Sequence, residues 1–400
     1  MRSRLGAIVC MGLNLIGLGL CAYLEFLHLA LMRGELLGGA ACGAAGTIFN
    51  CHAVTASPFG QVFGLPLALW GLIGYLATLS LALIAWQFPD HASTALASLV
   101  TVSLGFVVAD VALLSVMITQ IHYLCPLCLA TYGVNLLLLV VASCTAAQPW
   151  PGVITQLPAT LSAWIPRQGR EAAWMFWGMI LTGTALILAL NTATAFMLEG
   201  APGTMHKQMV QFVGQQRRVQ VDTGNSPKKG SAAPTVQLVE FSDFLCPSCQ
   251  RASRLNPVLL AAHQREVALV FKFFPLDTEC NTSISRQIHP TACQLAAAAA
   301  CAHEQGKFWA LHDRMFERMP NYKVTDIERD ATEIGVDVAA FQACLQNGRG
   351  LEAVKRDIAE AARIGITSTP TYIVNGIPMT GVITPAVFIE LLDALRQSSS

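Results

Sequence analysis

Residues 236–249 have the sequence Val-Gln-Leu-Val-Glu-Phe-Ser-Asp-Phe-Leu-Cys-Pro-Ser-Cys, an apolar run followed by two cysteines three positions apart. The run Val236–Phe241 predicts a buried strand, and the residues from Cys246 to His263 predict a helix. At a helix start, positions i and i+3 lie on one face, within disulfide reach of each other. The helix N-terminus also stabilises a thiolate at the first cysteine, which favours redox chemistry.

The sequence after this stretch continues to alternate between strand and helix patterns. The expected elements are a second strand at 267–274 and a block of helices at 290–304, 308–319, 338–345 and 351–363. After them we expect a hairpin of strands at 371–374 and 377–380, with its turn at Asn375-Gly376, and a last helix at 384–396. A strand–helix–strand unit, a helical block and a hairpin–helix unit predict a mixed α/β fold with a central sheet covered by helices.

The first half of the chain has a different composition. Of the 400 residues, 54% are hydrophobic and 12% are charged. Ten of the 50 charged residues precede Glu199, namely Arg2, Arg4, Glu25, Arg33, Glu35, Asp90, Asp110, Arg167, Arg170 and Glu171. Five apolar runs are long enough to span a bilayer, at about 5–31, 65–85, 92–118, 126–147 and 173–198. This composition excludes a disordered chain and a basic nucleic-acid binder, and it predicts a membrane half and a water-exposed half.

The Lys and Arg residues of the short loops predict the orientation in the membrane. Arg2 and Arg4 place the N-terminus in the cytoplasm, and five spans put Arg167 and Arg170 on the same side, against Arg33 outside. A signal peptide is the alternative for the first run, but the run is longer than a signal core, so we expect an uncleaved anchor. We therefore expect a multi-pass protein of the cytoplasmic membrane whose second half faces the periplasm or the cell exterior.

These patterns divide the chain into four parts. We expect a membrane domain at 1–150, a cytoplasmic loop and fifth transmembrane helix at 151–198, a linker at 199–233 and a soluble redox domain at 234–400. The linker contains the polar, turn-rich stretch 224–231, Gly-Asn-Ser-Pro-Lys-Lys-Gly-Ser.

The thirteen cysteines indicate an oxidising compartment, and two pairs of them have CxxC spacing. Cys10, Cys21 and Cys144 lie within apolar runs, where we expect small buried side chains. The CxxC motifs are Cys-Pro-Leu-Cys at 125–128 and Cys-Pro-Ser-Cys at 246–249. A four-cysteine zinc site is the alternative and requires both motifs in one place. One motif opens a membrane helix and the other follows a soluble strand, so we favour redox chemistry and expect no metal.

Residues 233–397 resemble the DsbA-like branch of the thioredoxin superfamily. The resemblance rests on the CxxC motif after the first core strand, on the helical block, and on Thr369-Pro370-Thr371-Tyr372 before the hairpin. It implies a thioredoxin fold with a helical insertion and protein thiols as substrates. It also implies that Thr369 and a cis Pro370 present backbone to a bound substrate strand. Glu240 matches the family's buried acid near the resolving cysteine, with a surface carboxylate at the strand end as the alternative.

Four further cysteines lack CxxC spacing and allow three pairings. DsbA-like domains sometimes join the helices of their insertion by a disulfide. The resemblance therefore favours structural disulfides Cys280–Cys293 and Cys301–Cys344. Free cysteines in the core are the alternative.

Residues 5–147 resemble the vitamin K epoxide reductase family. That family is a four-helix unit with a cysteine pair in its first loop, here Cys42 and Cys51, and a CxxC motif at the outer start of its fourth helix, here Cys125 and Cys128. Three segments carry the match: Cys-His-Ala-Val-Thr-Ala-Ser at 51–57, Phe-Gly-Leu-Pro-Leu at 63–67 and Cys-Leu-Ala-Thr-Tyr at 128–132. Fusion to a thioredoxin-like domain through a fifth helix is typical of the bacterial members.

The resemblance implies a quinone, ubiquinone or menaquinone, as electron acceptor, with Tyr132 and Ser57 as its binding residues. We find no counterpart to the asparagine that some members use against the quinone. The expected partners are reduced exported proteins, the membrane quinone pool and membrane lipid, with no nucleic acid. Electrons would pass by thiol–disulfide exchange from the substrate through the pairs 246–249, 42–51 and 125–128.

Together these patterns predict a membrane thiol oxidoreductase that forms disulfide bonds in exported proteins. A membrane-fed disulfide reductase or isomerase is an alternative, because those proteins keep the same motifs. A non-enzymatic peptide-binding chaperone is disfavoured, since it has no use for a CxxC motif beside a quinone. Asp110 lies within the third apolar run, and a carboxylate inside a membrane segment is by default a candidate functional residue. The alternative is that Asp110 only forms a hydrogen bond to a neighbouring helix.

Overall fold

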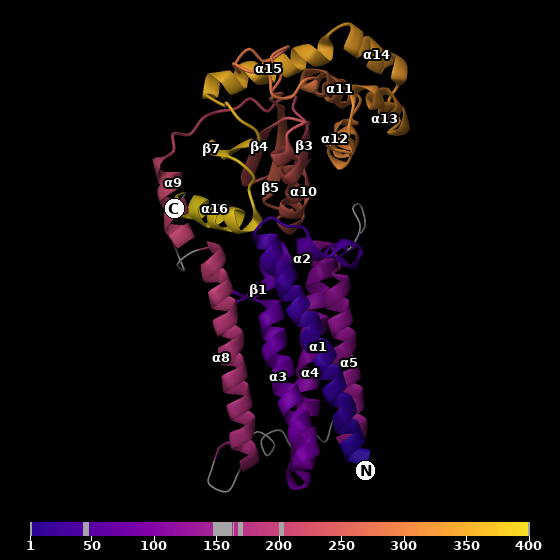
Figure 1. Cartoon of the computed structure of the whole chain (residues 1–400), viewed down its shortest axis with the longest axis vertical. Helices are drawn as coiled ribbons and strands as arrows, with labels where there is room; N and C mark the ends of the chain where they lie inside the picture. Colours follow the sequence, from indigo (N-terminus) through magenta and orange to yellow (C-terminus); the bar gives the residue numbers. More distant parts are fainter. Residues whose placement is uncertain are drawn as a thin grey trace. The chain divides into compact units, whose positions relative to one another are not determined.

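The computed structural model describes residues 2–42, 48–146, 162, 164–166, 171–199 and 204–398 (Figure 1). Arg167 and Arg170, which support the predicted orientation, lie outside the described residues. The chain divides into two compact units, Met1–Thr204 and Met205–Ser400, which we describe separately.

The first unit contains the five predicted membrane spans. Each is a helix long and apolar enough to cross a bilayer: α1 (Arg2–Met32), α3 (Leu67–Gln87), α4 (Ala92–Val116), α5 (Pro126–Ala146) and α8 (Glu171–Glu199). Helices satisfy their backbone hydrogen bonds internally, which an apolar surrounding requires. Helices α1, α3, α4 and α5 pack against one another as a bundle, and α8 packs against α3 (Figure 1). The prediction of five apolar helices is confirmed.

The ends of these helices are joined by short elements that matter for the cysteines. They are η1 (Gly39–Cys42), α2 (Cys51–Ala56), η2 (Pro58–Gly60), the hairpin β1 (Gln61–Val62) with β2 (Leu65–Pro66), η3 (Pro89–His91) and the π-helical turn η4 (Met117–Ile121). Asn50 caps α2, since its side chain accepts a hydrogen bond from the Ala53 N–H at 2.9 Å. The backbone of Phe49 forms a β-bridge with Leu124, the residue immediately before the Cys125–Cys128 motif.

The second unit is built on a five-stranded sheet of order β3-β5-β4-β6-β7. Its strands are β3 (Lys228–Gly230), β4 (Val236–Ser242), β5 (Val267–Phe273), β6 (Thr371–Val374) and β7 (Ile377–Thr380). Strands β4 and β5 are parallel, joined by α10 (Pro247–Ala262), and the other pairs are antiparallel. The predicted mixed α/β fold is confirmed.

Both faces of this sheet are covered, which explains the continuous apolar run in β4. Leu238 and Leu269 pack with residues of α10 and of α16 (Pro385–Ser398). Val239 and Phe241, whose side chains point to the opposite face, pack with α15 (Arg349–Ile364). The predicted helical block comprises α11 (Ala292–Glu304), α12 (Phe308–Glu317), η5 (Val324–Asp326), α13 (Ile327–Glu333), α14 (Val338–Gln346) and α15.

Two disulfides hold the helical block. Cys301–Cys344 joins α11 to α14, and Cys280–Cys293 joins the loop after β5 to the first turn of α11. They are the two pairs that the resemblance to DsbA-like domains favours.

The segment 199–233, expected to be a linker, contains regular structure. Helix α9 (Thr204–Gln215) buries Val213 in the core of the second unit, and β3 pairs with β5. The sheet therefore extends to residues before 234. The sequence pattern does not reveal β3, because all three of its residues are exposed and its pairing uses only backbone groups.

Candidate active site

The soluble CxxC motif lies at the start of α10. Cys246 is the N-cap residue of that helix, and Pro247 occupies its first position, where its missing N–H costs nothing. Cys246 is 7% exposed, whereas Cys249 is fully buried. The Cys246 Sγ lies 3.5 Å from the carbonyl oxygen of Thr369, and the Thr369–Pro370 peptide bond is cis. The fold thus brings Cys246 next to the Thr369–Pro370 loop, as the resemblance to DsbA-like domains implies.

The two sulfur atoms of this motif differ in acidity. A hydrogen bond from Cys249, together with backbone N–H groups of the first helical turn, lowers the pKa of Cys246 to about 6. Burial raises the pKa of Cys249. At neutral pH the reduced pair is therefore a thiolate at Cys246 and a thiol at Cys249, the asymmetry that thiol–disulfide exchange requires.

Glu240 is buried under this motif, with 1% of its surface exposed. Its Oε2 accepts a hydrogen bond from Asn256 at 2.6 Å, and Asn256 accepts one from the Tyr372 hydroxyl at 3.0 Å. Burial raises the pKa of Glu240 to about 7. The alternative of a surface carboxylate is wrong, because β4 is a central strand whose end lies under α10.

Four cysteines of the membrane unit form one cluster, in which Cys42, Cys51 and Cys125 are buried and Cys128 is partly buried. Cys51 opens α2, Cys125 directly precedes α5, and their Sγ atoms are 3.1 Å apart. Cys42, at the end of η1, is hydrogen-bonded to Cys51. The backbone N–H of Cys128 points to the Cys125 Sγ at 3.2 Å. The two predicted pairs of this unit therefore meet.

The Cys51 sulfur is the centre of this cluster. Hydrogen bonds from the Cys125 and Cys42 thiols hold the pKa of Cys51 well below its usual range. The hydrogen bond with Cys51 raises the pKa of Cys42, and hydrogen bonds with Cys128 and Cys51 raise the pKa of Cys125. Cys51 is thus the thiolate of the reduced cluster, in contact with a cysteine from each pair.

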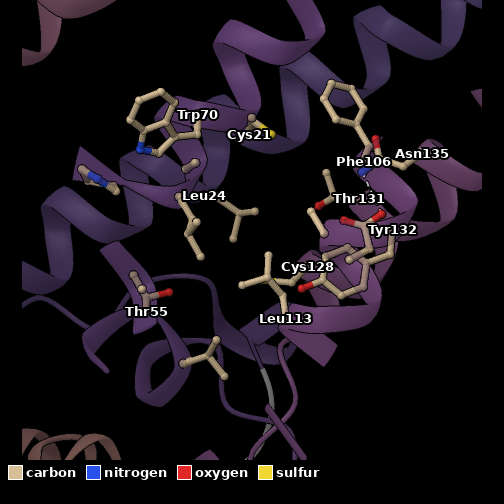
Figure 2. Close-up of a pocket in the computed structure, with 18 of the residues that line it drawn as sticks. Cys21, Leu24, Thr55, Trp70, Phe106, Leu113, Cys128, Thr131, Tyr132 and Asn135 are labelled. Carbon is tan, nitrogen blue, oxygen red and sulfur yellow. Dashed lines mark hydrogen bonds between the residues drawn. The ribbon is translucent and has the colours of Figure 1, made fainter. Parts of the chain in front are cut away.

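A cavity of about 270 Å³ lies between α1, α3, α4 and α5 (Figure 2). Its wall is mostly apolar, with side chains such as Leu24, Trp70, Phe106 and Leu113. Cys128 reaches this wall, so the cysteine cluster has one member in contact with the cavity. An apolar cavity that a sulfur atom borders suits a flat, apolar, redox-active molecule.

A chain of polar side chains crosses the wall of this cavity. The Tyr75 hydroxyl donates to Asn135 at 2.7 Å, and the Asn135 amide donates to Asp110 at 2.9 Å. All three side chains line the cavity, as does Tyr132. Asp110 therefore has both features considered for it, a hydrogen bond to a neighbouring helix and a place at a cavity.

The comparisons with known proteins follow this division of the chain. The sequence model of the vitamin K epoxide reductase family matches residues 8–143, and that of a thioredoxin family matches residues 222–394. The chain joins a vitamin K epoxide reductase family domain to a thioredoxin-like domain.

Curated relatives match only a part of this two-domain chain. The Na(+)/H(+) antiporter NhaA 3 of Salinispora tropica is 31% identical over 158 residues, 40% of this chain and 23% of the antiporter. NhaA 1 of Mycolicibacterium vanbaalenii is 32% identical over 167 residues, 41% of this chain and 25% of the antiporter. The chain spans about a quarter of the length of these relatives, and the activity in their names belongs to those proteins.

Solved structures with similarity to the chain include oxidoreductases. A thioredoxin-like oxidoreductase from Silicibacter pomeroyi is 25% identical with a TM-score of 0.38, covering 44% of this chain and 94% of that one. BdbD from Bacillus subtilis is 21% identical with a TM-score of 0.36, covering 46% of this chain and 97% of that one.

The wall of the cavity includes residues that the sequence expectations do not name. Ser57 does not line the cavity, because its hydroxyl donates to the Val54 carbonyl at 2.7 Å and ends α2; Thr55 lines the cavity instead. Asn135, which the sequence interpretation missed, does line it. Its position seven residues after Cys128, on the same helix face, is the signal that points to it.

The described part of the chain contains no group of three or more His, Cys, Asp or Glu side chains that could hold a metal ion.

Proposed function

We propose that this protein oxidises thiols of exported proteins and passes the electrons to a membrane quinone. The observation that carries the proposal is the 3.1 Å contact between the Cys51 and Cys125 sulfur atoms, next to a cysteine that borders an apolar cavity. This contact joins a loop pair to a membrane pair, as a chain of disulfide exchanges requires.

In the thioredoxin-like domain, the first step takes place at Cys246. A substrate thiolate attacks the Cys246 Sγ, the bond to Cys249 breaks, and Cys249 leaves with the electron pair and takes up a proton. The second substrate thiol, after losing its proton, attacks the substrate sulfur of the mixed disulfide, and Cys246 leaves as a thiolate. The low pKa of Cys246 makes it the better leaving group. Two electrons and two protons leave the substrate.

In the reductase domain, the same exchange would move these electrons inward. The reduced pair Cys246–Cys249 would reduce a Cys42–Cys51 disulfide. Cys51, as the thiolate, would then attack Cys125 in a Cys125–Cys128 disulfide, and Cys128 would leave as the reduced sulfur at the cavity. Cys42 would attack Cys51 in the resulting Cys51–Cys125 mixed disulfide, re-form the Cys42–Cys51 disulfide and release Cys125. Each transfer breaks one disulfide and forms another, so the redox state of the chain is restored once Cys125 and Cys128 are oxidised again.

The residues of the cavity fit a quinone. A bound quinone accepts two electrons and two protons, which match one dithiol. The apolar wall formed by Leu24, Phe106 and Leu113 suits an uncharged ring. The hydroxyl of Tyr132 is available to donate a hydrogen bond to a carbonyl oxygen, since it lines the same wall.

The test replaces Cys128. With Cys128→Ser, anaerobic mixing of reduced protein substrate, this protein and a quinone should yield no quinol, while Cys246 still forms a mixed disulfide in a single turnover. The matched control is Cys144→Ser, because Cys144 lies on the same helix and is exposed. Quinol formation by the Cys128→Ser variant at the rate of the unaltered protein contradicts the proposal.

Direction and orientation are part of the proposal and are tested in cells. The pair 246–249 should rest mainly as a disulfide, whereas a reductase or isomerase would keep it reduced. Reporter fusions after Ala53 and Gly230 should lie outside, and fusions after Gln87 and Arg167 should lie in the cytoplasm. A cytoplasmic reporter at Gly230 contradicts a relay from the soluble domain to Cys42 and Cys51.

A further inference from the structure

Asp243, between β4 and the CxxC motif, is a fully buried carboxylate that organises the active-site turn. Its Oδ1 accepts the N–H of Leu245 at 2.7 Å, and its Oδ2 accepts the N–H of Leu276 at 2.7 Å. Its backbone carbonyl accepts the N–H of Cys246 at 3.1 Å, and its own N–H points to the Cys249 Sγ at 3.5 Å. One residue therefore contacts both halves of the motif.

The remaining partner of this carboxylate is an imidazole. The Nδ1 of His289 lies 2.9 Å from the Asp243 Oδ2, and 19% of the histidine side chain is exposed. The hydrogen bond with Asp243 raises the pKa of His289, and the negative charge of Cys246 acts in the same direction. The imidazole of His289 therefore lies on the far side of the Asp243 carboxylate from the motif, within electrostatic range of Cys246.

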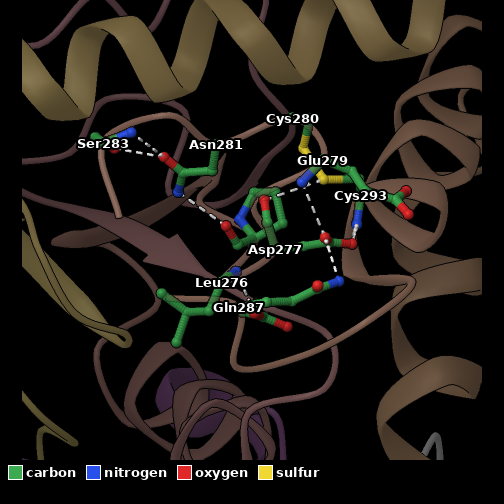
Figure 3. The surroundings of a disulfide bond; sticks show 10 residues. Leu276, Asp277, Glu279, Cys280, Asn281, Ser283, Gln287 and Cys293 are labelled. Atoms are coloured by element: carbon green, nitrogen blue, oxygen red, sulfur yellow. Dashed lines mark hydrogen bonds between the residues drawn. A yellow bond between two sulfur atoms is a disulfide. The ribbon is translucent and has the colours of Figure 1, made fainter. Parts of the chain in front are cut away.

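The loop that carries His289 is held by backbone hydrogen bonds, by a disulfide and by hydrogen bonds to Asp277. The N–H groups of Ile288 and His289 both donate to the Leu276 carbonyl, at 3.0 and 2.9 Å. The Cys280–Cys293 disulfide closes the loop, and Asp277 accepts hydrogen bonds from the Cys293 N–H and the Gln287 side chain (Figure 3). The position of the imidazole is thus fixed by the disulfide-closed loop 276–293.

We propose that His289 is a positioning residue that stabilises the thiolate of Cys246, and that the Cys280–Cys293 disulfide keeps it in place. This role goes beyond the proposed function, because it applies to disulfide exchange in either direction. Whenever Cys246 is the leaving sulfur, it takes the electron pair of the broken bond and becomes an anion. A nearby imidazolium lowers the energy of that anion without accepting or giving a proton.

The other groups around the turn do not supply this charge. Glu240 faces it from β4, Asp243 lies within it, and Cys249 faces it from α10. Each of these is neutral or negative. Among these described groups, His289 is therefore the one that can be cationic.

The experiment measures the acidity of Cys246 in the full-length reduced protein. Iodoacetamide alkylation of Cys246 is followed from pH 5 to 9 by peptide-resolved mass spectrometry. With His289→Gln, we expect the midpoint to rise by about one pH unit, so that the rate below the midpoint falls about tenfold. His303→Gln is the matched control, because His303 bonds to the Asn225 carbonyl. We expect this variant to leave the midpoint of Cys246 unchanged.

A second variant separates charge from structure. His289→Lys retains a cation, so its midpoint should stay near that of the unaltered protein. A midpoint that rises equally with Gln and Lys, or that moves with neither, overturns the proposal.

The double variant Cys280→Ala with Cys293→Ala tests the disulfide. It should raise the Cys246 midpoint, and adding His289→Gln should raise it no further. A midpoint that the double variant leaves unchanged overturns the role of the disulfide. The His289 variants decide the role of the imidazole even where the double variant does not fold.

Discussion

In the thioredoxin-like domain the two active cysteines come from a single helical turn, whereas in the reductase domain four cysteines come from three separate segments. Cys246 owes its low pKa to its own helix start and to Cys249. Cys51 owes its low pKa to thiols from elsewhere in the chain, those of Cys125 and Cys42. The first site is built by local sequence and the second by tertiary structure, so they should respond differently to substitution.

The largest expected effect is on the assembled site. With Cys125→Ser, Cys51 loses its exchange partner, and steady-state oxidation of protein thiols should fall by about 100-fold or more. Single-turnover reaction at Cys246 should persist, because that site needs no residue of the membrane unit. Cys10→Ser is the control, since Cys10 is buried in α1 outside the cluster. Continued steady-state turnover would show that the cluster is not on the electron path.

The cavity beside the assembled site gives a smaller effect. Tyr132→Phe removes a hydroxyl proposed to hold a quinone carbonyl, so the KM for quinone should rise by about tenfold while kcat changes less. The measurement is quinone-dependent turnover at varied quinone concentration. Tyr23→Phe, on the exposed side of α1, should leave the KM unchanged. An unchanged KM in Tyr132→Phe would remove this hydroxyl from the binding residues.

A helix cap tests how much the assembled site depends on its scaffold. Asn50→Ala removes the cap of α2, which costs about 1 kcal/mol, so Cys51 should meet Cys125 less often and turnover should fall several-fold. Asp337 caps α14 through the Ala340 N–H in the same way, far along the chain from any CxxC motif. Asp337→Ala should therefore lower stability without lowering turnover. Equal losses of turnover in both variants would argue against a local role of the cap.

The local site should show its effect in the pH dependence of stability and not in turnover. Glu240 has a folded pKa of about 7, above its ordinary value of 4.5, because it is buried. Its stabilising contribution is full below pH 4.5 and is lost as the pH rises through 7, by up to about 1.4 kcal/mol per unit. Glu240→Gln should flatten the fall in melting temperature between pH 5 and 7.5. Glu266→Gln, at a surface ion pair with Arg396, should leave that fall intact.

The sequence predicted those parts of the molecule that local patterns specify. The strand–turn–helix around Cys246 and the five apolar helices follow from periodicity and hydropathy, which neighbouring residues determine. The contact between Cys51 and Cys125 was expected only through a family resemblance, because 74 residues separate the two cysteines. No local pattern states which side chains meet across that distance.

The misses have the same physical origin. The strand β3 has three exposed residues and is held by backbone pairing with β5, so it carries no apolar signal. Asn135 lines the cavity because of how the helices pack, which its own sequence neighbours do not state. The hydrogen bond between Asp243 and His289 spans 46 residues and depends on the path of a loop.

The bridge between Phe49 and Leu124 affects which substitutions, insertions and deletions near Cys51 the chain can tolerate. The Asn50 N–H donates to the Leu124 carbonyl at 2.9 Å, and the Leu124 N–H donates to the Ile48 carbonyl at 2.8 Å. Only main-chain atoms take part, so replacing the side chain at 48, 49 or 124 removes neither bond. The bridge also fixes Cys51 independently of the number of residues between it and Cys42. Insertions and deletions between Cys42 and Ile48 are thus compatible with an intact Cys51–Cys125 contact.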